Sequence, residues 1–112
     1  SNIFQLVETD IDNNDKFSKK EVQSIELCIA NFQKEILEYY KPTEKKLLEI
    51  TNKLDYVITA TDRLGKFDWT NVFVSTLISI AMNMGIDTST GIQVWNILKV
   101  AFSDIKQIIS KQ

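Results

Sequence analysis

Hydrophobic residues recur at helical spacing through the first half of the chain. One series begins after Ser18 and advances in steps of three and four residues: Val22, Ile25, Ile29, Phe32, Ile36 and Tyr39. A second series after Thr43 has the same steps: Leu47, Ile50, Leu54, Val57, Thr61 and Leu64. Such steps place the side chains on one face of a helix, in the heptad pattern of a coiled coil. The two series therefore predict two amphipathic helices of similar length.

The ends of these two helices are also visible in the sequence. Ser18 and Glu21 have the spacing of a capping box, in which each side chain accepts a hydrogen bond from the other residue's backbone N–H. Pro42 cannot continue the first helix, and Thr43 is suited to cap the second. Gly65 is expected to stop the second helix. The stretch from Ser18 onward is thus predicted to be an antiparallel helical hairpin.

The second half of the chain is poor in charge. No charged residue lies between Asp68 and Asp87. We expect Asp68 to cap a helix over residues 69–84, and Asp87 or Thr88 to open a last helix that ends near Ser110. The last helix has two apolar faces, as expected of a helix that covers two neighbours. These residues predict a second helical hairpin.

The predicted helix over residues 69–84 carries a narrow polar strip on a broad apolar surface, with Asn71, Ser75, Ser79 and Asn83 at steps of four. A buried central hairpin would explain this composition. Protein interfaces share it, because they are depleted in charge and enriched in aromatic residues and Met. The candidate interface residues are Trp69, Asn71, Phe73, Ser75, Ser79, Met82, Asn83 and Trp95.

These elements predict an all-α fold: a four-helix antiparallel bundle of two hairpins, preceded by a short helix at residues 3–9. The length of 112 residues suits one domain, and three Gly with one Pro leave little material for an all-β fold. The expected parts of this single domain are an N-terminal segment with an acidic loop (1–17), a heptad hairpin (18–64) and a charge-poor hairpin (68–110).

Composition excludes several kinds of chemistry. The chain has no His, which removes the commonest general base and zinc ligand. The net charge is −2 and no basic stripe is present, so we expect no nucleic-acid binding. The lone Cys28 cannot form an internal disulfide and is expected to be a small buried residue. Together with the lack of a visible signal peptide, it favours an intracellular location. We find no catalytic centre and expect the protein not to be an enzyme.

Residues 10–21 resemble the calcium-binding loop of the EF-hand family. The matching positions of the twelve-residue loop are Asp10, Asp12, Asn14, Lys16 (through its carbonyl), Ser18 and Glu21. The resemblance implies a Ca²⁺ site at these residues. Asp15 replaces the usual Gly at the sixth position, and no good second loop is present. A polar linker that ends in a capping box would explain the same residues.

Three functions follow from these patterns. The leading one is a non-enzymatic interaction or oligomerisation module, bound to itself or to a partner helix. Because the chain begins with Ser1 and Asn2, we expect it to be a piece of a longer protein. The alternatives are a calcium-binding domain and a helical hairpin that interacts with a membrane, since the uncharged run over residues 69–86 reaches the lower length limit of a membrane span.

Overall fold

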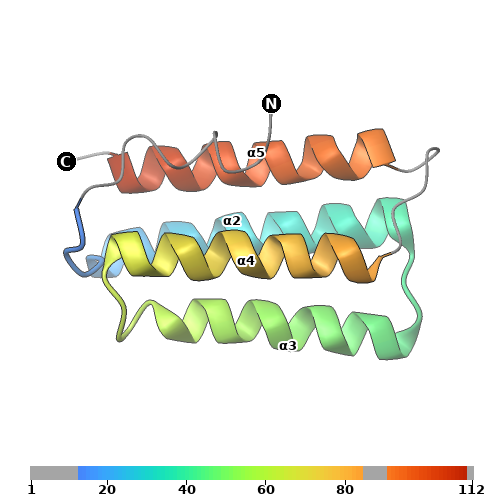
Figure 1. The fold of residues 1–112 in the computed structure, drawn as a ribbon, viewed down its shortest axis with the longest axis horizontal. Coiled ribbons are helices and arrows are strands. Elements are labelled where there is room, and N and C mark those ends of the chain that lie inside the picture. The colour runs from blue at the N-terminus through green and yellow to red at the C-terminus, as the bar shows by residue number, and fades with distance from the viewer. Residues whose placement is uncertain (1–12, 85–90, 111–112) are drawn as a thin grey trace.

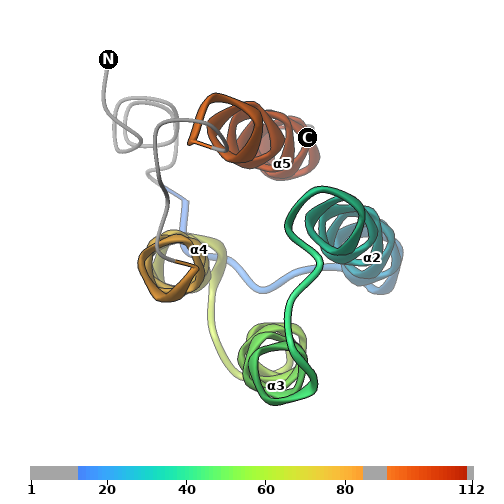
Figure 2. The same cartoon turned by 90° about the vertical axis from the view of Figure 1, so that its right-hand side faces the viewer.

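The computed structural model describes residues 13–84 and 91–110. They form four helices: α2 (Lys19–Tyr40), α3 (Glu44–Ala60), α4 (Lys66–Asn83) and α5 (Gly91–Ser110). Consecutive helices run in opposite directions (Figure 1), and seen end-on they occupy the four corners of the bundle in chain order (Figure 2). The predicted all-α, four-helix antiparallel bundle is confirmed. The helix expected at residues 3–9, and the caps expected at Asp87 and Thr88, lie outside the described residues.

The capping box at the start of α2 is present as predicted. The Glu21 N–H donates to Ser18 Oγ over 3.1 Å, and the Ser18 N–H donates to Glu21 Oε1 over 2.8 Å. At the other end, Lys41 adopts a left-handed conformation with φ of 52°, and its N–H donates to the Leu37 carbonyl. Pro42 follows directly, so the chain turns here and α3 begins at its cap, Thr43.

The junction between α3 and α4 differs from the expectation. α3 ends at Ala60, and Gly65 is the N-cap of α4, with its carbonyl accepting from the Trp69 N–H over 2.8 Å. Asp68 therefore lies in the first turn of α4 and is not its cap. Gly65 has a spatial role: a Cβ at this position would collide with the backbone carbonyl and side chain of Asn14. Glycine here lets the N-terminal segment cross the start of α4.

Most of both heptad series points into the core. The buried members are Ile25, Ile29, Phe32, Ile36, Ile50, Leu54, Val57 and Thr61. The ends of the series are less buried: Tyr39 is half exposed, and Leu47 and Leu64 are of intermediate burial. Cys28 joins the core, as expected. The heptad pattern therefore predicted the inward faces correctly in the middle of each helix.

The helices pair differently from the two hairpins that the sequence suggests. α2 contacts α5 most extensively, and α3 contacts α4 next, whereas the contact between α4 and α5 is the smallest. Small residues bring α2 and α5 together, since Cys28 Sγ lies 3.8 Å from the Ala101 carbonyl oxygen. The most extensive contacts are thus those of the first described helix with the last, and of the two middle helices with each other.

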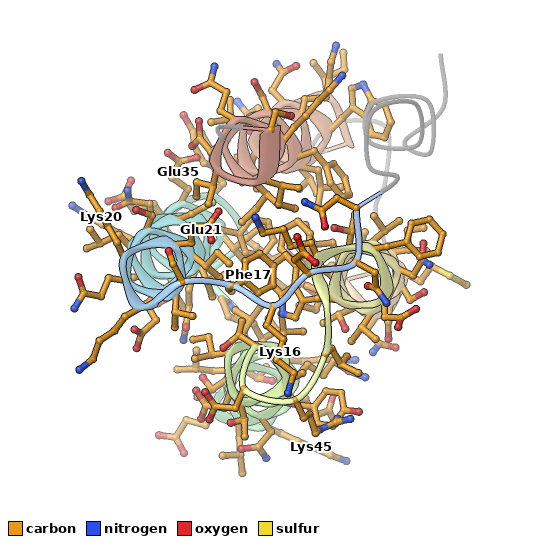
Figure 3. All side chains as sticks on the ribbon, turned by 90° about the vertical axis from the view of Figure 1, so that its left-hand side faces the viewer. Lys16, Phe17, Lys20, Glu21, Glu35 and Lys45 are labelled. Atoms are coloured by element: carbon orange, nitrogen blue, oxygen red, sulfur yellow. The ribbon has the colours of Figure 1, made fainter. Side chains whose placement is uncertain are left out.

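Four aromatic rings connect the N-terminal segment to α5 through the core. Phe17 lies at the end of the bundle (Figure 3) and meets Trp69 edge-on, with ring centroids 5.3 Å apart. Trp69 stacks on Phe73 at 5.0 Å, and Phe73 meets Phe102 edge-on at 5.7 Å. The Trp69 indole N–H donates to the Val57 carbonyl over 2.8 Å, which satisfies an acceptor in the last turn of α3.

Candidate functional site: the groove between α3 and α4

The structure divides the eight candidate interface residues into buried and exposed groups. Trp69 and Phe73 are buried in the core and cannot contact a partner, which corrects their assignment to the interface. The physical reason is that the aromatic side of the uncharged stretch faces inward, where the rings stack on one another. Trp95 and Ser79 are of intermediate burial. The exposed members are Asn71, Ser75, Met82 and Asn83.

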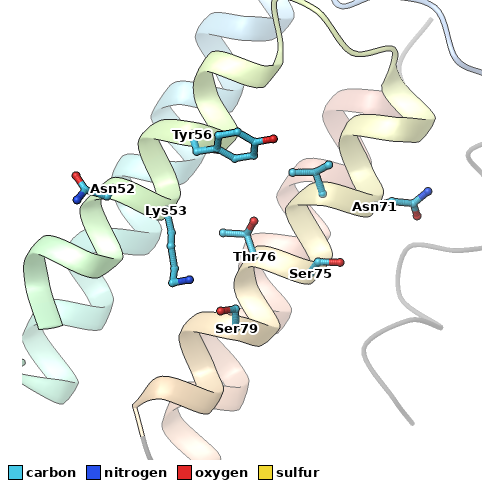
Figure 4. Close-up of a pocket in the computed structure, with 8 residues that line it drawn as sticks. Asn52, Lys53, Tyr56, Asn71, Ser75, Thr76 and Ser79 are labelled. Carbon is cyan, nitrogen blue, oxygen red and sulfur yellow. The ribbon is translucent and has the colours of Figure 1, made fainter.

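The polar strip of α4 forms one wall of an open groove of about 590 Å³ between α3 and α4. We call this the α3–α4 groove. Figure 4 shows Tyr56 pointing from α3 toward α4, and Lys53 extending along the groove with Thr76 and Ser79 opposite it on α4. The residues that line it are Asn52, Lys53, Tyr56, Asn71, Val72, Ser75, Thr76 and Ser79.

The α3–α4 groove is neutral apart from one cation. Lys53 alone carries a charge among the lining residues, and it forms no ion pair within the described part of the chain. The nearby Lys46 is already engaged, because its Nζ donates to the Asn83 carbonyl over 3.1 Å and lies 3.9 Å from Glu49. An incoming group would therefore meet hydroxyls, amides and a single available ammonium.

Tyr56 lines the groove, and two further large apolar side chains lie about one helical turn from lining residues: Leu48 precedes Asn52 by four residues, and Met82 follows Ser79 by three. Tyr56 is 54% exposed, Leu48 is 61% exposed and Met82 is 76% exposed. The Tyr56 ring is held in place by Arg63, whose Nη2 donates to the phenol oxygen over 2.8 Å and whose guanidinium lies 5.6 Å from the ring centroid. Exposed apolar groups next to a groove with a single charged residue are typical of a binding surface.

Sequence reasoning identified the α4 wall of this groove and missed the α3 wall. Leu48, Asn52 and Tyr56 lie at steps of four on the side of α3 away from the heptad series. Charged residues such as Lys45, Glu49 and Lys53 are interspersed with them, which is the pattern of an ordinary solvated helix face. The alternation of large apolar and amide residues at steps of four was the signal that could have found it.

A second surface, between α2 and α5, has the opposite charge. A groove of about 310 Å³ is lined by Glu35, Glu38, Tyr39, Gln93, Asn96, Ile97 and Val100, and we call this the α2–α5 acidic surface. No cation is among these residues, and neither Glu35 nor Glu38 forms an ion pair within residues 13–84 and 91–110. Tyr39 and Val100 are 52% and 53% exposed beside the carboxylates.

Cys28 also reaches a surface groove between α2 and α5, which it shares with Asp104. Burial, followed by the charge of Asp104, raises the pKa of the thiol to about 12. Because the thiolate is the reactive form of cysteine, this thiol is chemically quiet near neutral pH. Its position against Ala101 points to a packing role.

The acidic loop is tied to the start of α4 in the residues that are described. Asn14 accepts a hydrogen bond from the Asp68 N–H over 3.1 Å and donates one to the Asp68 carboxylate over 3.0 Å. Lys16 donates through its Nζ to the Asp62 carbonyl over 3.4 Å. These contacts fasten the segment across the end of the bundle.

Glu21 is held by two partners at once. Its Oε1 accepts from the Ser18 N–H, and its Oε2 lies 3.1 Å from Lys66 Nζ at the start of α4. Partial burial raises the pKa of Glu21, but the hydrogen bond from Ser18 and the Lys66 ammonium together outweigh it, and the net pKa is lowered. Glu21 therefore connects α2 to α4 as a carboxylate.

The calcium hypothesis stays a prediction. Asp10 and Asp12 lie outside the described residues, and no group of three or more acidic or Cys residues within the described ranges is arranged to hold a metal ion. Of the remaining proposed ligands, the side chains of Asn14, Ser18 and Glu21 have protein partners. A calcium ion at Glu21 would have to compete with Lys66.

None of the described helices combines the length and the apolarity needed to cross a bilayer.

Comparison of the chain with protein-family models, with curated proteins and with solved structures finds no match. The function is therefore inferred from the surfaces themselves.

We expect Glu21→Gln to lower the free energy of unfolding near neutral pH by roughly 1 kcal/mol, since it removes the carboxylate of the capping box. The pKa of Glu21 is lower in the folded state, so its stabilisation is present above pH 4.5 and lost as the pH falls through the folded pKa. Urea titrations from neutral to acidic pH should show a smaller acid-induced loss in the variant. The control Glu26→Gln, at an exposed position, should behave like wild type; identical acid profiles for all three proteins would contradict the assignment.

We expect thermal melts in roughly millimolar calcium and in chelator to give the same Tm, because Glu21 is already neutralised by Lys66. A ligand that binds only the folded state must raise its stability, and millimolar calcium is far above the Kd of a sensor loop. A higher Tm in calcium that disappears in Asp10→Asn would instead support the EF-hand-like site.

Proposed function

We propose that the chain is a non-enzymatic interaction module that associates with further copies of itself through the α3–α4 groove. The observation that carries this proposal is the uncharged polar strip of α4, which faces exposed Tyr56 across the groove. Lys53 is the only charged lining residue, and it has no ion pair within the part of the chain that the structure describes. Surfaces of monomeric proteins usually intersperse charges of both signs and avoid large apolar patches.

The energetics of the groove favour association with protein over continued exposure to water. Burying Met82, Leu48 and Tyr56 against a second molecule would remove apolar area from water, which is favourable by about 25 cal/mol per Å². Small hydroxyl side chains such as Ser75 and Ser79 allow close approach of another helix. Charged residues oppose such burial, and Lys53 is the only charged residue among those that line the groove, while the Arg63 guanidinium lies over the Tyr56 ring.

The non-enzymatic part of the proposal is supported by the same residues. The lining of the α3–α4 groove offers hydroxyls, amides and one ammonium, without a carboxylate, thiol or imidazole to pair with them. General acid–base or nucleophilic catalysis relies on such pairs within hydrogen-bond reach. The groove is therefore better suited to contact than to proton transfer.

Light scattering of the wild-type protein across a range of concentrations tests the proposal. We expect the molar mass to rise above 12.9 kDa in the high micromolar range. Ser75→Arg places a long charged side chain in the middle of the groove and should keep the protein monomeric. Arginine is a good helix former, so the exposed position should tolerate it without unfolding.

Gln23→Arg makes the same kind of change at an exposed position near the start of α2, outside the α3–α4 groove, and should associate like wild type. Circular dichroism confirms that all three proteins are folded. A strictly monomeric wild type, or equal association of Ser75→Arg and wild type, would refute the proposal.

A further inference from the structure

We infer that the occupant of the α3–α4 groove is α2 of a second copy, which presents Glu35, Glu38 and Tyr39 to Lys53. Copies would then join head to tail. This inference rests on the proposed self-association and specifies which surface the second copy offers.

Charge complementarity selects this pairing. The α3–α4 groove contains Lys53 and no carboxylate, whereas the α2–α5 acidic surface contains Glu35 and Glu38 and no cation. None of these three groups forms an ion pair in the part of the chain that the structure describes. Placing either surface against its own kind would bring like charges together, which costs free energy, while opposite surfaces attract.

The side chains on α2 are spaced for one contact. Glu38 and Tyr39 follow Glu35 by three and four residues, so both are neighbours of Glu35 on the helix surface, within about one turn. Figure 3 shows Glu35 on the side of α2 that is turned toward α5. One turn of helix thus offers two carboxylates next to a half-exposed aromatic ring.

The receiving groove has matching features. A ridge of side chains on one helix packs into the groove between others, so a groove between α3 and α4 can accept the ridge of a third helix. Tyr39 would find Tyr56 and Met82 as exposed apolar neighbours, and aromatic rings contact Met sulfur favourably. Lys53 would meet a carboxylate from the same turn of α2.

The positions of the two surfaces determine the form of the assembly. α2 and α5 lie on one side of the bundle and α3 and α4 on the opposite side (Figure 2). One copy can therefore use both surfaces at the same time. A contact between two different surfaces closes into a ring only if its rotation allows, and otherwise continues as an open array. We expect the molar mass to keep rising with concentration, without a plateau at the dimer.

A charge-exchange experiment tests the inference. One variant is Lys53→Glu, and the other is Glu35→Lys with Glu38→Lys. Each variant alone carries like charges on both surfaces, so we expect its self-association to be at least about fivefold weaker than that of wild type. In an equimolar mixture every contact between unlike variants joins opposite charges, so association should return to near the wild-type level.

Lys45→Glu is the matched control. It reverses a lysine on α3 that is exposed and does not line the groove, and Figure 3 shows it at the outside of the bundle. It should change association less than Lys53→Glu does. Circular dichroism and thermal melts of all variants exclude unfolding as the cause of any loss.

The possible results separate the two proposals. Recovery in the mixture supports α2 as the occupant. If wild type associates and Ser75→Arg abolishes association, but the mixture does not recover, the α3–α4 groove is still the binding surface and α2 is not its occupant. Unchanged association of Lys53→Glu alone would also overturn the inference, and a monomeric wild type would overturn both proposals.

Discussion

The contact between α2 and α5 determines where the other helices lie. It is the most extensive contact in the bundle, and it joins the first and last described helices through the close approach of Cys28 to Ala101. With α5 packed mainly on α2, its contact with α4 is the smallest. α4 therefore packs chiefly on α3, and its polar strip is left at the surface beside that helix. The α3–α4 groove is thus a consequence of the packing of α5 on α2 and of α4 on α3.

The N-terminal segment stabilises the end of this arrangement. Phe17 covers Trp69, Asn14 passes against Gly65, and Glu21 joins α2 to Lys66 at the start of α4. Asn14 and Glu21 are also two of the residues that give the acidic loop its resemblance to a calcium loop. Carboxylates and amides that resemble metal ligands in sequence can also accept hydrogen bonds from unpaired backbone N–H groups at helix ends and hold loops in place. In the described residues, Asn14 and Glu21 make the contacts of helix capping and loop closure. Calcium binding stays a prediction, because Asp10 and Asp12 lie outside the described residues.

Local features of the fold could be predicted from the sequence because they depend on neighbouring residues. The capping box at Ser18, the stop at Pro42 and the inward face of each heptad series are set within one or two helical turns. The role of Gly65 could not be predicted, since it arises from Asn14, which is distant in the chain. The burial of Trp69 and Phe73 also depends on tertiary packing. An uncharged aromatic stretch has the same composition whether it faces a core or a partner.

For the same reason, half of the candidate site was visible in the sequence and half was not. The polar strip of α4 stands out because no charged residue lies between Asn71 and Asn83. Lys53 and Tyr56 belong to a helix with an ordinary charged exterior, and only its packing against α4 brings them to the same groove. The opposite charge of the α2–α5 acidic surface likewise becomes visible only when residues of two helices are placed together.

Self-association through these two surfaces is tested most directly by measuring backbone amide chemical shifts in solution across a dilution series of the protein. We expect the amide resonances that shift with concentration to belong to residues along the α3–α4 groove and around Glu35 to Tyr39, while those of residues near Gln23 stay unchanged. Shifts that are independent of concentration, or that change only at residues outside these two surfaces, would contradict it.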